Sequence, residues 1–282
     1  MKAQNLTISI PPKEGIRSYG KICDKNCEYC ISRMTGYIPS DFGLVLRNIK
    51  KVITCSIGYS ITNVLITGKG EPLLNFPAVV EICNRFRDYP LEIQTNGLWL
   101  NKNLKAIGQL KSSGMDIIAI SIDRIAQLYD FEDMFTAIRD HGLTVRVCLN
   151  LTNKIDRAED FKSVFSIIKS MDIDQVVVRN IMVPVSIAET AEAERTAGWI
   201  EENVDPSRYE WWYKEFKKMV SEDDLIRVLP HGARVYDLDG IGVSFSDYCI
   251  QESNNTEDIR SLIFLEDGHL YTSWDKMSSR LF

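Results

Sequence analysis

The sequence contains no apolar run of 18 residues, and its first residues lead into no hydrophobic signal segment. It also shows no internal repeat of solenoid period and no low-complexity tract. These absences predict a soluble, cytoplasmic protein with no membrane partner.

An excess of positive charge is absent as well. The formal net charge is −6, which argues against broad electrostatic binding to nucleic acid or to an anionic membrane. Apolar residues make up 45% of the chain and charged residues 26%, an ordinary composition for a globular protein with a well-filled core. The length of 282 residues permits one large α/β barrel or a barrel with a small extension, and does not choose between them.

Short β-branched runs alternate with helical patterns from Leu6 to Pro184. Six strand runs occur in this stretch, and the alternation predicts βαβ units with a parallel sheet. Right-handed crossovers would curl six units into an open barrel or into a flat doubly wound sheet. We expect residues 1–184 to form this α/β core domain.

The pattern changes after Pro184. Two helical stretches precede several β-like runs, and an Asp-Gly hairpin turn lies within the segment Leu265-Glu266-Asp267-Gly268-His269. We expect residues 185–282 to form a small C-terminal α+β extension that covers the barrel mouth.

Three of the seven cysteines, Cys23, Cys27 and Cys30, lie within eight residues. In a cytosolic chain, clustered cysteines indicate metal binding or redox chemistry before disulfides. Three thiolates in one loop can hold zinc or an iron–sulfur cluster. A structural zinc site normally needs four protein ligands, and no second Cys or His pair lies nearby. A four-iron cluster held by three cysteines instead leaves one iron without a protein ligand, so that this iron can bind a substrate or cofactor. Zinc, and three surface cysteines without metal, stay open as alternatives.

The spacing Cys-x3-Cys-x2-Cys, with Tyr29 directly before the last cysteine, resembles the signature of the radical S-adenosylmethionine (SAM) superfamily. The resemblance implies a partial (β/α)6 TIM-like barrel and a [4Fe–4S] cluster on Cys23, Cys27 and Cys30, whose open iron binds SAM. It also implies reductive cleavage of SAM to a 5′-deoxyadenosyl radical, which abstracts hydrogen from a peptide or small-metabolite substrate. An electron donor such as flavodoxin or ferredoxin would complete the reaction.

Further motifs follow the predicted strands in the order of this family. The segment Thr67-Gly68-Lys69-Gly70-Glu71-Pro72 resembles the Gly-Gly-Glu-Pro motif, whose backbone and glutamate hold the methionyl ammonium of SAM. Glycine lets the backbone approach a ligand, and a carboxylate pairs with an ammonium. The Gly-x-Gly-Glu-Pro-Leu form also resembles adenosine-C2 RNA methylases, whose further catalytic cysteines have no match here, so that activity is not carried over.

The remaining candidates for SAM binding lie on the later strands or at their ends. Parallel barrels gather their ligands at the carboxyl ends of strands, which is where most of these residues are expected. With Tyr29, Gly68, Gly70 and Glu71, the set comprises Thr95, Asn96, Ser121, Asp123, Arg146 and Asn150.

The C-terminal hairpin resembles that of the SPASM and twitch extensions, which carry additional clusters. Those extensions usually place a cysteine after the hairpin turn, whereas here the stretch reads Tyr271-Thr272-Ser273-Trp274, and only Cys249 precedes the hairpin. We therefore expect one cluster in total. Cys249 is a candidate hydrogen donor in catalysis, as in radical SAM epimerases.

Two other functions compete with direct action on a substrate. The chain could be an activating enzyme that installs a glycyl radical on a large partner enzyme. It could also be a non-catalytic module that uses the three cysteines for zinc. Metal analysis separates the last of these from the two enzymes, and replacement of Glu71 would weaken SAM binding only in an enzyme.

Overall fold

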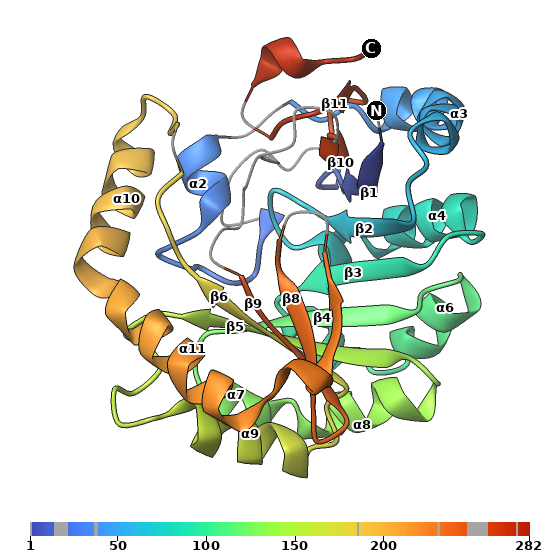
Figure 1. Cartoon of the computed structure of the whole chain (residues 1–282). Coiled ribbons are helices and arrows are strands. Elements are labelled where there is room, and N and C mark those ends of the chain that lie inside the picture. The colour runs from blue at the N-terminus through green and yellow to red at the C-terminus, as the bar shows by residue number, and fades with distance from the viewer. Residues whose placement is uncertain are drawn as a thin grey trace.

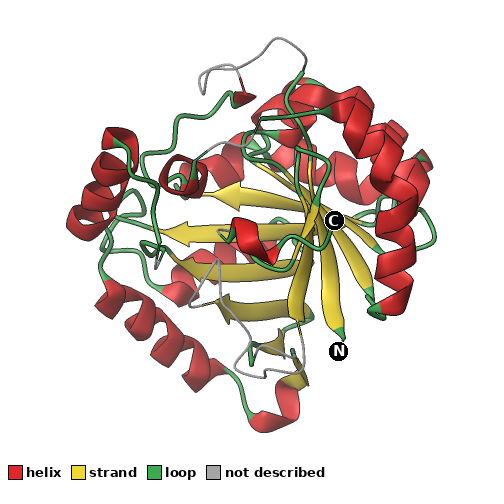
Figure 2. Ribbon diagram, turned by 90° about the horizontal axis from the view of Figure 1, so that it is seen from above, coloured by secondary structure: helices red, strands yellow, loops and turns green. Residues whose placement is uncertain are grey.

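A computed structural model describes residues 2–13, 22–36, 39–184, 186–229, 232–246, 259–274 and 276–282. One sheet of eleven strands runs through them, in the order β11-β10-β1-β2-β3-β4-β5-β6-β9-β8-β7. The sheet is strongly curved, and its helices pack around the outer side (Figures 1 and 2). Its strands are β1 (Ala3–Ser9), β2 (Asn63–Thr67), β3 (Leu91–Thr95), β4 (Ile117–Ile122), β5 (Thr144–Leu151), β6 (Gln175–Asn180), β7 (Leu225–Val228), β8 (Arg234–Leu238), β9 (Ile241–Ser246), β10 (Ile259–Phe264) and β11 (Leu270–Tyr271).

The helices alternate with the first six strands and then follow in a pair. Among the described residues they are α2 (Ile31–Thr35), α3 (Phe42–Gly58), α4 (Phe76–Phe86), α5 (Leu98–Lys102), α6 (Ala106–Ser112), α7 (Ala126–Asp130), α8 (Glu132–Asp140), α9 (Phe161–Ser170), α10 (Ala191–Asn203) and α11 (Pro206–Met219), with short 3-10 turns η1 (Pro72–Asn75), η2 (Glu222–Asp224) and η3 (Met277–Ser279).

Strands β1 to β6 pair in parallel, each with the next. Alternate residues such as Leu6, Ile8, Val64 and Ile66 are fully or almost fully buried, because they face the helices that return the chain between strands. The predicted parallel α/β barrel is confirmed. Its sheet ends at two different edge strands, β11 and β7, so the barrel is open rather than closed.

Polar caps fix where several helices begin. The Asp41 carboxylate accepts a hydrogen bond from the Leu44 amide at 2.8 Å, and the Asp160 carboxylate accepts one from Ser163 at 2.7 Å. Each bond satisfies an amide that the first turn of a helix leaves free. Between β4 and β5 the chain forms two short helices, α7 and α8, because Phe131 leaves helical geometry between them.

Strands from the C-terminal part of the chain lengthen both edges of the barrel sheet. Strand β9 pairs in parallel with β6, and β10 pairs in parallel with β1. The predicted hairpin is present, because β10 and β11 pair antiparallel around a turn in which Gly268 has φ +77°. Among the described helices, none has both the length and the apolar character that crossing a membrane demands.

Candidate functional site

The cysteine loop, residues 22–30, lies between β1 and α2 and rests on the carboxyl ends of β2 and β3. Cys23, Cys27 and Cys30 are half-buried and form no disulfide. Burial raises the pKa of the Cys23 thiol to about 12 and also raises the pKa of Cys27. Both thiols are therefore protonated at neutral pH in the metal-free chain, and metal binding would release these protons.

Gly70 brings the loop after β2 close against the cysteine loop. A Cβ atom added at Gly70 would lie 2.1 Å from the carbonyl oxygen of Ile22, which directly precedes Cys23. The Glu71 amide donates a 2.9 Å hydrogen bond to the same oxygen. Only glycine fits here, because any side chain would separate the two loops. At Gly68 the added atom would lie 3.3 Å from the Ile10 oxygen, a much milder contact.

The Glu71 carboxylate joins the end of β2 to the end of β3. One oxygen accepts hydrogen bonds from the Thr95 hydroxyl at 2.7 Å and the Leu73 amide at 3.1 Å, and the other accepts from the Asn96 amide at 2.8 Å. Glu71 is only 5% exposed, and burial raises its pKa to about 7 against the lowering effect of these donors. Since a carboxylate offers about four acceptor positions, one remains for a further donor.

Asn96 connects β3 to the cysteine loop itself. Its side-chain amide donates to the Asp24 carboxylate at 2.7 Å and lies 3.7 Å from the Cys23 sulfur. Its side-chain oxygen accepts from the Leu98 amide at 2.8 Å, which fixes the amide orientation. The position of Cys23 is therefore tied to the end of β3.

The ends of β4 and β5 contact the other side of the same loop. The Tyr29 hydroxyl donates to the Asp123 carboxylate at 3.0 Å and accepts from the Asn150 amide at 3.4 Å. The Lys25 ammonium lies 3.2 Å from the second Asp123 oxygen, as an ion pair without hydrogen-bond geometry. The Tyr29 ring also packs against Trp199 of α10, with ring centroids 5.9 Å apart. Burial raises the Tyr29 pKa, so the phenol stays protonated.

Most of the sequence-derived candidates thus meet around the cysteine loop, but Arg146 and Ser121 do not join this network. Arg146 lies near the amino end of β5, where it pairs with Glu92 and bonds Gln175 at 2.7 Å. It is four residues from Asn150, or about 13 Å along the strand. Ser121 is half-buried within β4. Cys249, the candidate hydrogen donor, lies outside the described residues.

Lys25, Asp24 and Trp199 were missed by reasoning from the sequence. Lys25 lies between two of the cysteines, so its charge was visible, but its partner Asp123 is 98 positions away in the chain. Trp199 lies beyond the six predicted strands, in α10. Local sequence patterns do not predict contacts between residues that lie so far apart in the chain.

The donor set provides the three thiol ligands of a four-iron cluster. Among the residues that the structure describes, no three His, Cys, Asp or Glu side chains are grouped closely enough to hold one metal ion. A zinc ion needs all its ligand atoms within about 2.3 Å of one centre, whereas a four-iron cluster places each thiolate on a different iron. Cys23, Cys27 and Cys30 supply three thiols from one loop, the number that a four-iron cluster with one open iron needs.

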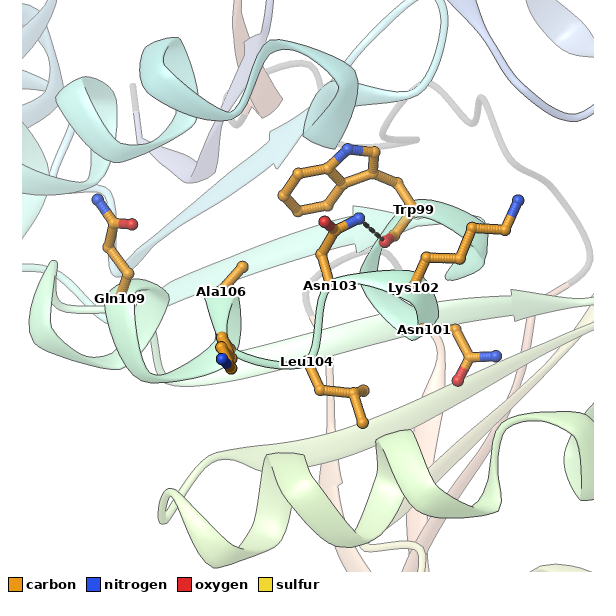
Figure 3. A pocket seen from close by; sticks show the side chains of 8 residues that line it. Trp99, Asn101, Lys102, Asn103, Leu104, Ala106 and Gln109 are labelled. Carbon is orange, nitrogen blue, oxygen red and sulfur yellow. Dashed lines mark hydrogen bonds between the residues drawn. The ribbon is translucent and has the colours of Figure 1, made fainter.

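A surface hollow lies beside α5 and α6 (Figure 3). None of the cysteine-loop or strand-end candidates lines it, and Asn103 within it bonds the Trp99 carbonyl at 2.7 Å. The hollow is lined by Trp99, Asn101, Lys102, Asn103, Leu104, Lys105, Ala106 and Gln109.

Comparisons with known proteins agree with the geometry. The model of the radical SAM superfamily matches residues 18–197. The chain is 30% identical over 142 residues to GTP 3′,8-cyclase of Clostridium acetobutylicum, which covers 47% of this chain and 42% of that enzyme. It is 28% identical over 124 residues to GTP 3′,8-cyclase 1 of Pseudomonas aeruginosa, covering 43% of this chain and 35% of that one. The matched stretches thus span less than half of either cyclase.

A solved structure extends the likeness of fold across almost the whole chain. SuiB of Streptococcus suis, bound to its precursor peptide SuiA, superposes with a TM-score of 0.54 at 12% identity, covering 96% of this chain and 59% of SuiB. At this identity the likeness concerns the fold alone. The family match covers well over half of the chain, and its cofactors are a [4Fe–4S] cluster and SAM. The chain belongs to the radical SAM superfamily and is an enzyme of that class.

Proposed function

We propose that Cys23, Cys27 and Cys30 hold the [4Fe–4S] cluster and that SAM binds beside it, against the ends of β2 to β5. The observation that carries this proposal is that segments at the ends of several strands contact residues 22–30. Ile22 contacts the Gly70–Glu71 segment, Asn96 contacts Cys23 and Asp24, and Asp123 contacts Lys25 and Tyr29.

The chain's own residues supply binding and positioning. When bound and reduced, the cluster supplies the electron that splits the S–C5′ bond of SAM, giving the 5′-deoxyadenosyl radical that abstracts hydrogen from the substrate. The remaining acceptor position of Glu71 suits the methionyl ammonium, and that positive charge would lower the Glu71 pKa and keep the carboxylate ionised. Gly70 holds this segment against the cysteine loop, because the Ile22 carbonyl fills the space where a side chain would lie.

The polar side chains of the proposed SAM site are shielded from water. Glu71, Thr95, Asp123 and Asn150 are each less than a tenth exposed, although each lies at or near the carboxyl end of a strand. Charges interact more strongly where water is excluded, and a reactive radical is protected there from side reactions. The C-terminal extension would complete this protection by covering the barrel mouth.

The proposed substrate is a peptide or a small metabolite, with flavodoxin or ferredoxin as the electron donor. Likeness of fold to SuiB, which was crystallised with a precursor peptide, supports a peptide. Likeness to the GTP cyclases, which for the Clostridium acetobutylicum enzyme covers 47% of the chain, supports a small metabolite. The activating-enzyme alternative requires a large partner enzyme, which co-purification would reveal.

Metal content and SAM binding test the proposal. Anaerobic reconstitution should load about four irons and four sulfides per chain, and a Cys27→Ser variant should lose most of them. Cys55→Ser is the matched control, because Cys55 is a half-buried cysteine in α3, away from the loop. If the wild type instead binds zinc and no sulfide, the cluster proposal is wrong and the zinc-binding alternative is supported.

A further inference from the structure

The cysteine loop and α2 pack on a minor core of apolar side chains, which is separate from the main core of the barrel. Cys27, one of the proposed iron ligands, lies against this minor core. Its buried members are Tyr29, Met34, Ile181, Ala197 and Ile200. The last three of these follow β6, so the apolar support of the loop comes largely from the segment after the sixth strand.

Helix α10 provides much of this support. It lies beside α2, the helix that directly follows the cysteine loop (Figure 1). Glu192 of α10 pairs with Arg33 of α2 at 3.6 Å, and the Ala188 amide donates to the Met34 carbonyl oxygen at 2.6 Å. The sequence pattern assigns α10 to the C-terminal extension, and the match to the superfamily model ends at residue 197, within this helix. The last turn of α10 therefore lies beyond the matched region.

Trp199 lies in this last turn and contacts the residue before the third cysteine. Its ring centroid is 5.9 Å from that of Tyr29, with 36° between the ring planes. Aromatic pairs at this separation are more stable than the buried area alone explains. The Tyr29 hydroxyl is already bonded to Asp123. Contacts at both ends of the Tyr29 side chain thus fix the backbone next to Cys30.

A lysine from the loop after β5 joins the same group. The Lys154 ammonium lies 5.9 Å from the centroid of the Trp199 ring and 2.5 Å from the carboxylate of Glu28. Glu28 directly precedes Tyr29, so the four side chains form a closed ring of contacts around this part of the cysteine loop. Glu28 and Lys154 are both partly exposed, which makes their ion pair the weaker part of the ring.

We propose that Trp199 is a positioning residue for the third iron ligand: it holds the Tyr29 ring and thereby keeps Cys30 where it retains a bound [4Fe–4S] cluster. The inference rests on the proposed function of the cysteine loop. Trp199 acts through Tyr29, as a residue that orients a ligand and is not itself one. Helix α10 is then part of the cluster site and more than a cover for the barrel.

Iron release from the reconstituted full chain tests this role without SAM or substrate. Wild type and variants are loaded anaerobically, and the transfer of iron to an excess of a ferrous chelator is followed over time. Trp199→Leu removes the aromatic contact and should release iron about tenfold faster. Trp199→Phe keeps a ring beside Tyr29 and should stay within about threefold of wild type.

A matched control separates positioning of the ligand from general loss of stability. Phe86 is fully buried in α4, in the main core, whereas Trp199 is half-buried. Phe86→Leu should therefore lower the urea midpoint of the cluster-free protein at least as far as Trp199→Leu does. Its iron release should nevertheless match that of wild type.

The ion pair gives a second, independent variant. Lys154→Met should speed iron release about twofold to threefold, because a partly exposed pair contributes little. Lys169→Met is its control, since it removes an exposed ion pair with Asp239 at 2.7 Å on another part of the surface, and should leave iron release unchanged.

The outcomes separate this inference from the proposed function. A loaded wild type with Trp199→Leu releasing iron equally slowly overturns the inference alone, and so does equal acceleration by Phe86→Leu. If Trp199→Leu does not fold, Lys154→Met decides, and release at the wild-type rate overturns the inference. A wild type that loads no iron and sulfide contradicts the proposed function before any variant is compared.

Discussion

Gly70→Ala is the sharpest test of the contact between the cysteine loop and the SAM-binding loop. The backbone of Gly70 has no left-handed conformation, so alanine meets only a steric cost. Its Cβ would lie 2.1 Å from the Ile22 oxygen and 2.7 Å from the Ile22 carbonyl carbon, both of them backbone atoms. Since a rotamer change cannot relieve this clash, the two loops must separate.

The expected cost follows from two contributions. Overpacking of a well-fitted site costs about 1–3 kcal/mol. Separation of the loops also breaks the 2.9 Å hydrogen bond from Glu71 to Ile22, which contributes about 1 kcal/mol more. We expect the variant to be less stable by about 2–4 kcal/mol.

Urea unfolding of the cluster-free proteins measures this cost, and SAM binding to the loaded proteins measures its consequence. Gly198→Ala is the matched control, because nothing lies within 4 Å of the added atom and Gly198 is inside α10. The control should be stabilised by up to about 1 kcal/mol. If Gly70→Ala unfolds at the wild-type midpoint and binds SAM as well as the control does, the proposed contact between the loops is wrong.

Three further predictions follow from the site. The Glu71 carboxyl has a folded pKa of about 7, so it keeps most of its proton as the pH rises from 5 towards 7, whereas the unfolded chain has already released it. The stability of the cluster-free protein should therefore fall by about 2 kcal/mol over that range, and Glu71→Gln should remove this part of the slope in urea titrations. Arg146→Met should cost about 2 kcal/mol by leaving Glu92 unpaired, yet leave the SAM dissociation constant unchanged; a tenfold loss of affinity would place Arg146 in the site. Tyr29→Phe should lower stability by about 1–2 kcal/mol through loss of the Asp123 bond, and unchanged thermal unfolding would show that this bond contributes nothing.

The regular part of the fold could be predicted from local pattern. The six strand runs between Leu6 and Pro184 are strands β1 to β6 of the structure, because their β-branched residues form short runs separated by helical patterns. The short helices α2 and α5 were missed, since five residues are too few to show a helical period. How β9 and β10 extend opposite edges of the sheet depends on long-range pairing that no local pattern encodes.

The sequence predicted which residues belong to the candidate site better than it predicted the contacts between them. Both glycines of the Gly68–Glu71 segment were identified, yet only the structure shows that Gly70 bears the tighter packing. Arg146 and Asn150 were both SAM-binding candidates and both lie on β5, but only Asn150 lies beside Tyr29. These distinctions come from register and from packing between distant segments.

The central claim is that the three-cysteine loop supports cleavage of SAM. The most direct measurement is the amount of 5′-deoxyadenosine formed anaerobically from SAM and dithionite by reconstituted wild type and by Cys27→Ala. The account predicts that wild type forms 5′-deoxyadenosine and the variant forms none. Equal formation by the variant, or none by a wild type that carries a full cluster and binds SAM with its substrate present, would contradict the account.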